Sequence, residues 1–507
     1  MALKKRKVEL MDTTLRDGEQ TSGVSFSAKE KLTVAKLLIE TLHVDRIEVA
    51  SARVSVGEFQ AVKDIIDWAT ASGYQDRVEV LTFVDQGVSI DWMVQSGAKV
   101  QNLLTKGSLN HLTHQLKKTP KQHFDEIQQT IALASSNGIR TNVYLEDWSN
   151  GMRNSKDYVL SFINFLATQN IERVLLPDTL GVVTPSETYE YIHELTSTFP
   201  QLRFDFHGHN DYDLSVANVM ESIRAGVNGV HLTVNGMGER AGNAPLASVV
   251  AAVNDFMPEI TIGIKEKNLY NVSKLVSAFS GIVIPANKPI VGDNVFTQTA
   301  GIHADGDSKN NLYFNDLLPE RFGRKRQYAL GKTSGKANIV KNLQGLGYSL
   351  TDEELKKVTQ RIIELGDKKE RITKEDLPYI ISDVLDKGSD LEKVRIESYV
   401  LTHAKGLKPT ATISIVINDK VYEESANGDG QFDAFMNAIR TIYKSQKTNL
   451  PNLVDYAVRI PPGSHSDALC ETTITWLTNQ KEFKTRGVDT DQTVSAIKAT
   501  EKMLNII

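Results

Sequence analysis

The sequence predicts an α/β protein: a TIM (β/α)8 barrel, then a mostly helical linker region, then a C-terminal α+β domain. Three observations lead to this prediction. Short apolar runs alternate with amphipathic stretches from residue 8 to about 260, this rhythm breaks after about residue 285, and strand-like segments prevail from about residue 393. The chain has 507 residues, too many for one hydrophobic core. We therefore predict domains at 1–284, 285–392 and 393–507.

The barrel prediction rests on eight apolar runs of strand length. These are Val8–Asp12, Arg46–Ala50, Val78–Phe83, Val100–Thr105, Thr141–Leu145, Arg173–Leu176, Arg203–Phe206 and Gly229–Val234. The stretches between them have helical periodicity, and capping-box patterns begin at Ser27, Thr119 and Thr184. Eight strands alternating with helices over about 250 residues are typical of a (β/α)8 barrel. The rival, an open doubly wound sheet, would need a glycine-rich phosphate loop that the sequence lacks.

The remaining chain differs in pattern. The linker region is predicted to be mostly helical, with helices at Asp352–Leu365 and Lys374–Leu385. From residue 393 a group of strands followed by a helix occurs twice, and the two helices are expected at Phe432–Tyr443 and Thr490–Leu504. Because a barrel enzyme does not need such a domain for its chemistry, we expect the domain to serve regulation.

The composition excludes several classes of protein. The net charge is −5, so the basic surface of a nucleic-acid-binding protein is not expected. No apolar stretch approaches the roughly 20 residues that cross a membrane, and no secretory signal pattern precedes the fold. The single cysteine, Cys470, excludes an intrachain disulfide and fits a reducing compartment. We expect a cytoplasmic protein that binds neither nucleic acid nor membrane.

Reactive residue types gather after the predicted barrel strands, where TIM barrels have their active sites. The segments are Thr14–Gln20, Ser51–Arg53, Tyr144–Asp147, Asp178–Thr179, His207–Asp211 and Asn235–Arg240. Polar residues distributed at random would not all fall at one end of the barrel.

A metal site is the first hypothesis for this cluster. His207 and His209 are two residues apart, so on a strand both side chains point to the same face. Together with Asp17 they would form an N,N,O site with positions left for substrate and water. The alternative is that both histidines are hydrogen-bonded polar residues lining the barrel mouth.

Two charged residues are candidates for the chemistry itself. Arg16 could neutralise a carboxylate or a developing oxyanion, and the alternative is an ion pair with Glu48 or Glu146. Glu146 could act as a general base or hold a substrate hydroxyl.

With these residues assembled, the chain resembles the family of 2-isopropylmalate, homocitrate and citramalate synthases. The matching motifs are Asp12–Gln20, Leu176–Gly181, His207–Asp211, Gly236–Leu246 and Gly301–Gly306. The similarity continues into the C-terminal domain, including Gly428-Asp429-Gly430 and the segment from Tyr456 through Pro461 to Pro462. Within the family, the similarity is most continuous with the (R)-citramalate synthases.

The resemblance implies that acetyl-CoA condenses with a 2-oxo acid, after which the thioester is hydrolysed. Asp17, His207 and His209 would hold a divalent metal, Mg²⁺ or Mn²⁺ with Zn²⁺ as the alternative. Asn243 would support this site from outside the ligand set or serve as a ligand itself.

The resemblance also implies roles for other residues. Arg16 would stabilise the alkoxide, Glu146 would take part in proton transfer, and Thr179 would hydrogen-bond the substrate. His303 would complete the site of a neighbouring subunit, which implies a homodimer.

The substrate side chain is expected to contact Leu81, Leu104 and Tyr144, which the resemblance assigns to the specificity pocket. Two leucines and a tyrosine leave little room, which favours pyruvate over the larger 2-oxoisovalerate of a 2-isopropylmalate synthase. The alternative is that Leu81 and Leu104 only pack the core.

The C-terminal domain resembles the allosteric module of the family, with isoleucine as the expected effector and leucine as the alternative. Its candidate effector region comprises Gly428, Asp429, Gly430, Tyr456 and Pro461. A 3-hydroxy-3-methylglutaryl-CoA lyase is a rival on the same barrel, but lyases use a cysteine near the barrel mouth. The only cysteine here, Cys470, lies far outside the barrel sequence.

Overall fold

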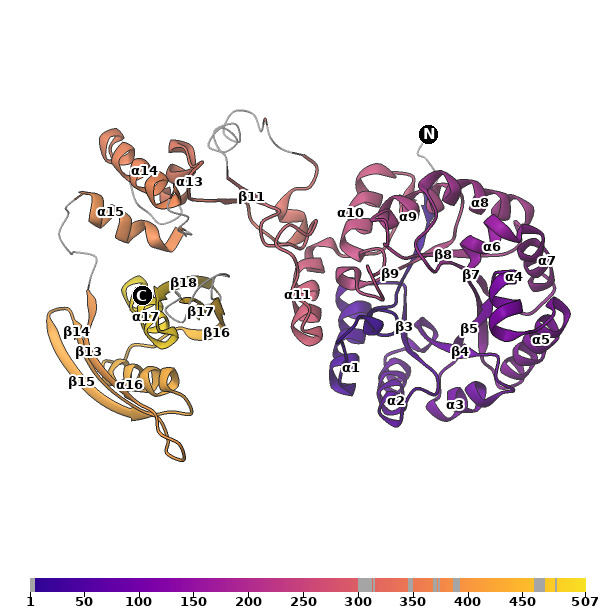
Figure 1. Ribbon diagram of the computed structural model, residues 1–507, viewed down its shortest axis with the longest axis horizontal. Helices are drawn as coiled ribbons and strands as arrows, with labels where there is room; N and C mark the ends of the chain where they lie inside the picture. The colour runs from indigo at the N-terminus through magenta and orange to yellow at the C-terminus, as the bar shows by residue number, and fades with distance from the viewer. Residues whose placement is uncertain are drawn as a thin grey trace. The chain divides into compact units, whose positions relative to one another are not determined.

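The computed structural model of the chain describes residues 5–299, 312, 315–344, 350–367, 372, 374–385, 393–459, 470–478 and 481–507 (Figure 1). These residues divide into two compact units. The first extends to Thr297 and also takes in the segment that ends at Arg326, and the second holds the rest. Each unit has its own hydrophobic core.

The first unit is a closed barrel of eight parallel strands, seen end-on in Figure 1. Its strands are β2 (Glu9–Asp12), β3 (Arg46–Ser51), β4 (Val78–Phe83), β5 (Val100–Lys106), β6 (Arg140–Glu146), β7 (Arg173–Asp178), β8 (Phe204–Gly208) and β9 (Gly229–Leu232). Each of the eight predicted apolar runs forms one of these strands. The predicted TIM barrel is therefore confirmed.

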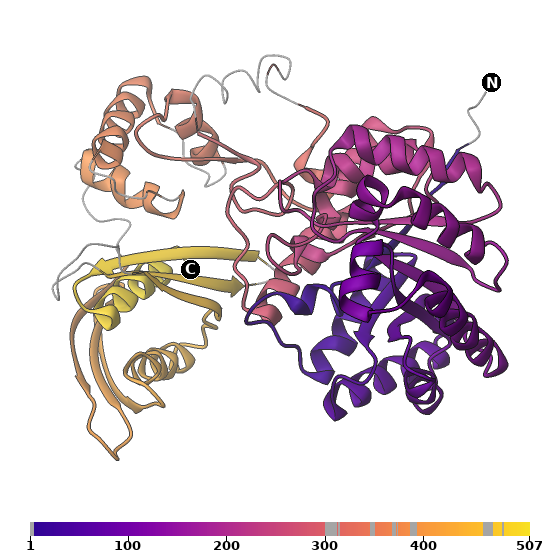
Figure 2. The ribbon, with the colours of Figure 1, turned by 45° about the vertical axis from the view of Figure 1, so that its right-hand side comes forward.

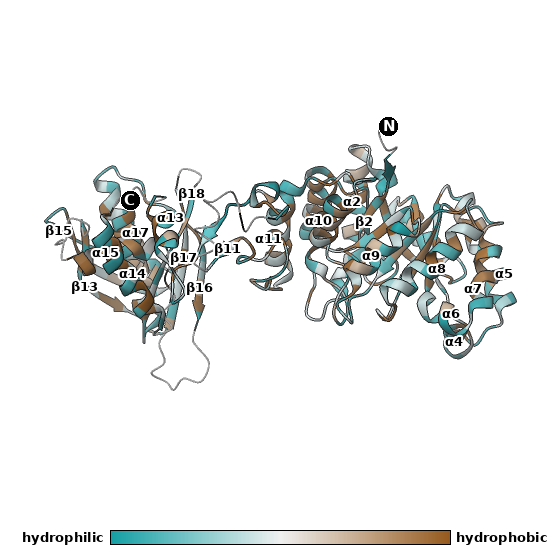
Figure 3. Cartoon of the chain, turned by 90° about the horizontal axis from the view of Figure 1, so that it is seen from above, coloured by the Kyte–Doolittle hydropathy of each residue, from teal (hydrophilic) through white to brown (hydrophobic). Residues whose placement is uncertain are grey.

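Helices surround the barrel (Figures 1 and 2). They are α1 (Ala28–Lys36), α2 (Val56–Ala71), α3 (Val88–Ser96), α4 (Leu109–His111), α5 (Pro120–Ser136), α6 (Trp148–Asn154), α7 (Lys156–Leu166), α8 (Pro185–Thr198), α9 (Ser215–Arg224), α10 (Leu246–Phe256) and α11 (Leu269–Ser280). The capping boxes expected at Ser27, Thr119 and Thr184 are all present. Many of these helices carry both hydrophobic and hydrophilic residues in Figure 3, because one face of each packs on the strands.

Short elements complete the barrel unit. The pair β1 (Arg6–Lys7) and β10 (Ile260–Thr261) is parallel. Single turns of helix include η1 (Gly18–Gln20), η2 (Leu37–Leu42), η3 (Gln75–Arg77), η4 (Leu112–Leu116), η5 (Val234–Gly236), η6 (Glu266–Asn268) and η7 (Pro319–Phe322). Of these, η1 follows the first barrel strand and η5 follows the last.

The linker region contributes helices to the second unit. They are α13 (Lys336–Gln344), α14 (Asp352–Asp367), η8 (Lys374–Asp376) and α15 (Leu377–Leu385), and β11 (Thr297–Gln298) pairs with β12 (Gln327–Tyr328). The three α-helices share a small core that includes Ile339, Val358 and Leu377. The two helices predicted in this region therefore occur.

The C-terminal part is built from two antiparallel three-stranded sheets, each followed by a helix. The first comprises β13 (Val394–Thr402), β14 (Thr410–Ile417), β15 (Lys420–Asn427) and α16 (Gln431–Ser445). The second comprises β16 (Asn452–Arg459), β17 (Cys470–Thr478), β18 (Lys481–Asp489) and α17 (Gln492–Ile506). One hydrophobic core contains residues of both halves.

The predicted α+β domain is therefore confirmed, with one addition. Strand β18 (Lys481–Asp489) has the sequence KEFKTRGVD, and its charged residues hide the strand pattern. Pairing with β17 along its whole length makes it a strand. Among the helices that the structure describes, none combines the length and apolar character that a membrane-spanning helix requires.

Candidate metal centre and substrate pocket

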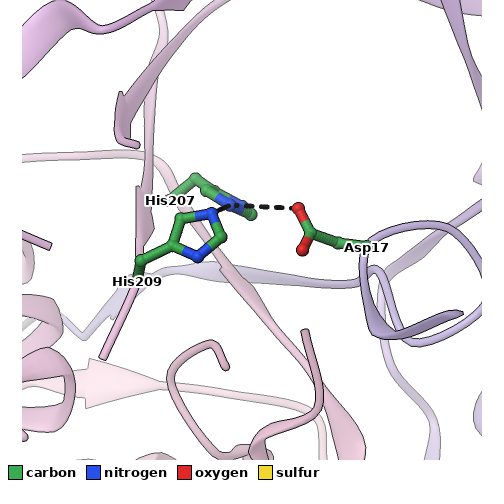
Figure 4. Close-up of side chains that lie close together, drawn as sticks. All are labelled: Asp17, His207 and His209. Atoms are coloured by element: carbon green, nitrogen blue, oxygen red, sulfur yellow. Dashed lines mark hydrogen bonds and ion pairs between the residues drawn. The ribbon is translucent and has the colours of Figure 1, made fainter. Parts of the chain in front are cut away.

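Asp17, His207 and His209 come together at the carboxyl ends of the barrel strands (Figure 4). His207 lies in β8, His209 follows that strand directly, and Asp17 lies in the turn after β2. The Nε2 atoms of the two histidines are 3.3 Å apart, and His207 Nε2 is 3.4 Å from Asp17 Oδ2. All three side chains are buried. Two imidazoles and a carboxylate therefore point at one small region.

The protonation of these groups suits a divalent cation. Burial lowers the pKa of both His207 and His209, so their rings are neutral and keep a lone pair for a ligand. Burial alone would raise the pKa of Asp17, but the charge of the Arg16 guanidinium, helped by the hydrogen bond from Asn243, outweighs it and holds that pKa well below its usual range. Within the described chain, the buried Nδ1 atoms of both histidines lack a hydrogen-bond partner. The three residues thus fit a metal ion.

Asn243 supports Asp17 from the loop after β9. Its Nδ2 donates to Asp17 Oδ1 at 2.9 Å and to the Met237 carbonyl at 3.0 Å. Its buried Oδ1 has no hydrogen-bond partner in the part of the chain that the structure describes. Gly238, with φ +148°, lets the loop approach this closely, because a Cβ atom there would overlap the Asn243 amide. The expected link between Asn243 and the metal site is consistent with this contact.

Arg16 has two acidic partners. Its Nη1 donates to Asp17 Oδ2 at 2.7 Å and its Nε to Glu48 Oε2 at 2.6 Å. A third contact, 3.3 Å long, joins its Nη2 to Tyr144 Oη. Of the two ion pairs weighed for Arg16, the one with Glu48 forms. Glu146 instead pairs with Lys106.

Glu48 itself is fully buried and held in place by neighbours. It accepts hydrogen bonds from Asn102 Nδ2 and Thr13 Oγ1, each 2.7 Å long. The Arg16 guanidinium is therefore fixed in direction before any substrate binds.

Leu81, Leu104 and Tyr144, on neighbouring strands β4, β5 and β6, form one small apolar cluster with Leu175 of β7. The Tyr144 ring meets the His207 ring edge-on, with centroids 6.0 Å apart. The cluster therefore adjoins the metal centre. Residues that line a pocket and residues that pack a core are both buried, so burial does not distinguish the two roles. The specificity role of these residues stays a prediction.

Glu146 and Thr179 lie at the same end of the barrel. Glu146 is the last residue of β6 and forms its ion pair with Lys106, the last residue of β5. Thr179 follows β7, and its hydroxyl oxygen accepts a hydrogen bond of 2.9 Å from the Asp147 amide. Their predicted catalytic roles stay predictions.

Other predicted residues lie in the second unit or outside the described residues. His303 and Pro461 lie outside them. Gly428, Asp429 and Gly430 form the turn between β15 and α16, and Gly430 is the N-cap of that helix. Tyr456 lies in β16, and its ring contacts Phe432 with centroids 5.3 Å apart.

Sequence reasoning missed Leu175 and, more importantly, His231. His231 lies in β9, is fully buried, and its Nδ1 is 2.9 Å from Tyr144 Oη. A histidine in the middle of an apolar strand run was a signal that could have drawn attention to it.

Comparisons with protein families cover nearly the whole chain. A family described as HMGL-like matches residues 7–276, one described as homocitrate synthase post-HMGL domain-like matches 290–370, and one described as the LeuA allosteric (dimerisation) domain matches 371–507. The last begins upstream of residue 393, where the strand pattern set our boundary. The domain boundaries at 284 and 392 remain predictions.

Two curated relatives from Methanocaldococcus jannaschii align along the full chain. An (R)-citramalate synthase is 33% identical over 99% of this chain and 99% of its own. A 2-isopropylmalate synthase is 32% identical over 99% of this chain and 95% of its own.

Proposed function

This chain belongs to the family of citramalate and 2-isopropylmalate synthases, acyltransferases with an HMGL-like barrel and a LeuA allosteric domain, and from that premise we propose that it is an (R)-citramalate synthase. It would condense acetyl-CoA with pyruvate and hydrolyse the thioester.

One observation carries the choice of pyruvate: the cluster of Leu81, Leu104, Tyr144 and Leu175 beside Arg16 and the candidate metal ligands. A 2-oxo acid with its carboxylate and carbonyl near Arg16 and Asp17 would direct its side chain toward these four residues. Three leucine side chains and a phenol ring around the substrate side chain would leave little room beyond a methyl group. A branched side chain would have to displace them, and steric exclusion discriminates more strongly than the 1–3 kcal/mol or so that a methylene gains by attraction.

A divalent metal held by Asp17, His207 and His209 would supply positive charge beside the oxo-acid oxygens. The chain's own residues would do the rest. Arg16, fixed by Asp17 and Glu48, has a guanidinium edge available to stabilise negative charge on the oxygen of the attacked carbonyl. Burial of this guanidinium strengthens that interaction.

Proton transfer is assigned to Glu146. Its carboxylate lies at the carboxyl end of β6, where Lys106 holds it by an ion pair. Thr179 would bind the substrate through its hydroxyl hydrogen, since its oxygen already accepts from Asp147. His303 of a neighbouring subunit would complete the site.

The regulatory part of the proposal concerns residues 371–507. We assign isoleucine as the effector, because an enzyme that forms citramalate would be inhibited by the amino acid made from it. The proposal includes a homodimer and a cytoplasmic location.

The second candidate is a 2-isopropylmalate synthase, which would use 2-oxoisovalerate and respond to leucine. It is supported by the relative of that name, which is 32% identical over 99% of this chain. That identity is nearly the same as for the citramalate synthase, so overall similarity does not choose between the substrates.

The test follows the release of free CoA from acetyl-CoA with a thiol reagent, with Mg²⁺ or Mn²⁺ present. Pyruvate and 2-oxoisovalerate are compared at equal concentration, and an Asp17→Asn variant gives the background hydrolysis. Faster turnover with pyruvate supports the proposal. Faster turnover with 2-oxoisovalerate replaces it by the second candidate.

A further inference from the structure

A row of buried polar groups runs inward from the pocket wall through the barrel. Tyr144 Oη is 2.9 Å from His231 Nδ1, and His231 Nε2 is 3.5 Å from Asp205 Oδ2. His231 and Asp205 are both fully buried. None of the chemistry assigned above uses either residue.

Asp205 is held as a carboxylate. Arg46 forms an ion pair with its Oδ2, and Arg173 Nη1 donates to its Oδ1 at 3.0 Å. Burial alone would raise the pKa of Asp205, but the two arginines outweigh it and keep that pKa below its usual range. Gly229, paired with Asp205 across β8 and β9, leaves room for the carboxylate, because a Cβ atom there would lie 2.7 Å from both oxygens.

The carboxylate decides which nitrogen of His231 carries the proton. An ionised carboxylate only accepts hydrogen bonds, so an Nε2–H facing it is attracted whereas an Nε2 lone pair would be repelled. At 3.5 Å the attraction is electrostatic rather than a short hydrogen bond. With the proton on Nε2, Nδ1 is an acceptor.

The direction of the Tyr144 hydroxyl follows. Its hydrogen is donated to His231 Nδ1, and its oxygen is left to accept from Arg16 Nη2 at 3.3 Å. The phenol ring is thereby held in one orientation, and its oxygen adds a third contact to the guanidinium that Asp17 and Glu48 also hold.

We propose that His231 is a positioning residue: by accepting the Tyr144 hydroxyl hydrogen, it holds the pocket wall and the Arg16 guanidinium in the arrangement that binds the 2-oxo acid. This inference rests on the proposed function for the identity of the ligand, but the contact that it invokes is independent of which oxo acid binds. His231 acts through Tyr144 and does not touch the substrate.

The test uses a matched pair of amide variants. His231→Asn puts an amide oxygen where Nδ1 lies and keeps an acceptor for Tyr144. His231→Gln puts its amide where Nε2 lies, so it faces Asp205 and leaves Tyr144 without an acceptor. Both variants are neutral, and a thermal unfolding curve of each confirms that the barrel is folded.

The measurements are the dissociation constants of pyruvate and 2-oxoisovalerate by calorimetry, with Mn²⁺ and without acetyl-CoA, together with the KM and kcat. We expect His231→Gln to raise the dissociation constant and KM of the preferred oxo acid about fivefold to tenfold, the size of one buried hydrogen bond. We expect kcat to change less, and His231→Asn to stay within about twofold of the wild type.

The decisive comparison is made in the Tyr144→Phe background, where the hydroxyl is gone. There the Asn and Gln variants should bind the oxo acid equally, because the effects of substituting two residues that act through one contact are not additive. Equal effects of the two amides in the wild-type background, or a difference between them that persists in the Tyr144→Phe background, would overturn the inference. A wild-type preference for 2-oxoisovalerate overturns the proposed substrate instead, and the same cycle is then read with that oxo acid.

Discussion

The buried charged residues at the barrel mouth do not balance one another. Arg16 is shared by Asp17 and Glu48, so these three groups carry one negative charge in excess. Burying an unbalanced charge is costly. A divalent cation beside Asp17 would offset this negative charge and leave one positive charge for an anionic substrate to balance, which gives the candidate site a reason to bind a cation beyond the identity of its ligands.

Asn243 offers the sharpest test of that site. Its amide orients Asp17, so Asn243→Ala should weaken Mn²⁺ binding about tenfold to a hundredfold, as expected for a residue that orients a metal ligand. Asp17→Ala should abolish binding. Calorimetric titration with Mn²⁺ measures both, with Asn170→Ala on the exposed surface as the control. Unchanged affinity in Asn243→Ala would remove Asn243 from the metal site.

Leu103 and Leu104 provide a matched pair for the pocket. They are neighbours in β5 and point to opposite faces, Leu104 toward the cluster with Tyr144 and Leu103 into the main core. Leu104→Ala should raise kcat/KM for 2-oxoisovalerate relative to pyruvate by about tenfold or more. Leu103→Ala should lower the Tm and leave that ratio unchanged. The assignment of Leu104 to the pocket would fail if both variants changed the ratio equally.

His123 should make stability depend on pH. Burial lowers its pKa to about 4 in the folded chain, whereas an exposed histidine titrates near about 6.5. Between these values the unfolded chain binds a proton that the folded chain does not, so stability falls as pH falls. Going from about pH 7.5 to about pH 5 should cost on the order of 2 kcal/mol.

His123→Gln keeps an acceptor for the Lys106 amide and cannot titrate. Urea unfolding of both proteins at the two pH values measures the difference. An equal loss of stability in the variant would mean that other groups cause the acid sensitivity.

At the scale of elements, close approach of a strand to a helix depends on a few glycines. Gly487 in β18 lies against α17, and a Cβ atom there would overlap the Ser495 carbonyl oxygen. Gly430, at the start of α16, has open space around it. The two positions in one domain therefore differ in what a methyl group would meet.

Gly487→Ala should destabilise the C-terminal domain by about 1–3 kcal/mol through overpacking, whereas Gly430→Ala should cost less than about 1 kcal/mol. Amide hydrogen exchange of a peptide from β17 reports on this domain, and a peptide from β5 reports on the barrel. We expect faster exchange only in β17, and only in Gly487→Ala. Equal exchange in both variants would contradict the close packing of β18 on α17.

At the scale of the whole molecule, the barrel unit holds every described candidate residue for the condensation, and the C-terminal domain holds the candidate effector region. The candidate residues for chemistry and for regulation thus lie in parts of the chain that have separate hydrophobic cores. If the effector binds only the C-terminal domain, removing that domain removes inhibition, whatever its effect on the rate without effector.

Deleting residues 393–507 should therefore abolish inhibition by isoleucine in the CoA-release assay. Leucine serves as the comparison effector in the full-length enzyme. A full-length Asp429→Ala variant, altered in the turn before α16, should need a higher isoleucine concentration for half-inhibition. Isoleucine inhibition that survives the deletion would show that the effector site lies elsewhere.

Much of the fold could be predicted from the sequence, because local periodicity encodes it. Each barrel strand is an apolar run of about the length that a strand needs, and each helix face recurs at helical spacing. Strand β18 was not predicted, because the charged residues of KEFKTRGVD obscure that pattern. Only its pairing with β17 makes this segment a strand.

The sequence by itself determined which residues end the barrel strands, and hence that Asp17, His207 and His209 would share one end of the barrel, because parallel strands bring their carboxyl ends together. Only the tertiary structure decided which side chains are in contact with one another. The Asn243–Asp17 contact joins residues 226 positions apart, and the Tyr144–His231 contact joins residues 87 positions apart. Barrel closure and side-chain packing create such pairs, and no periodicity along the chain records them.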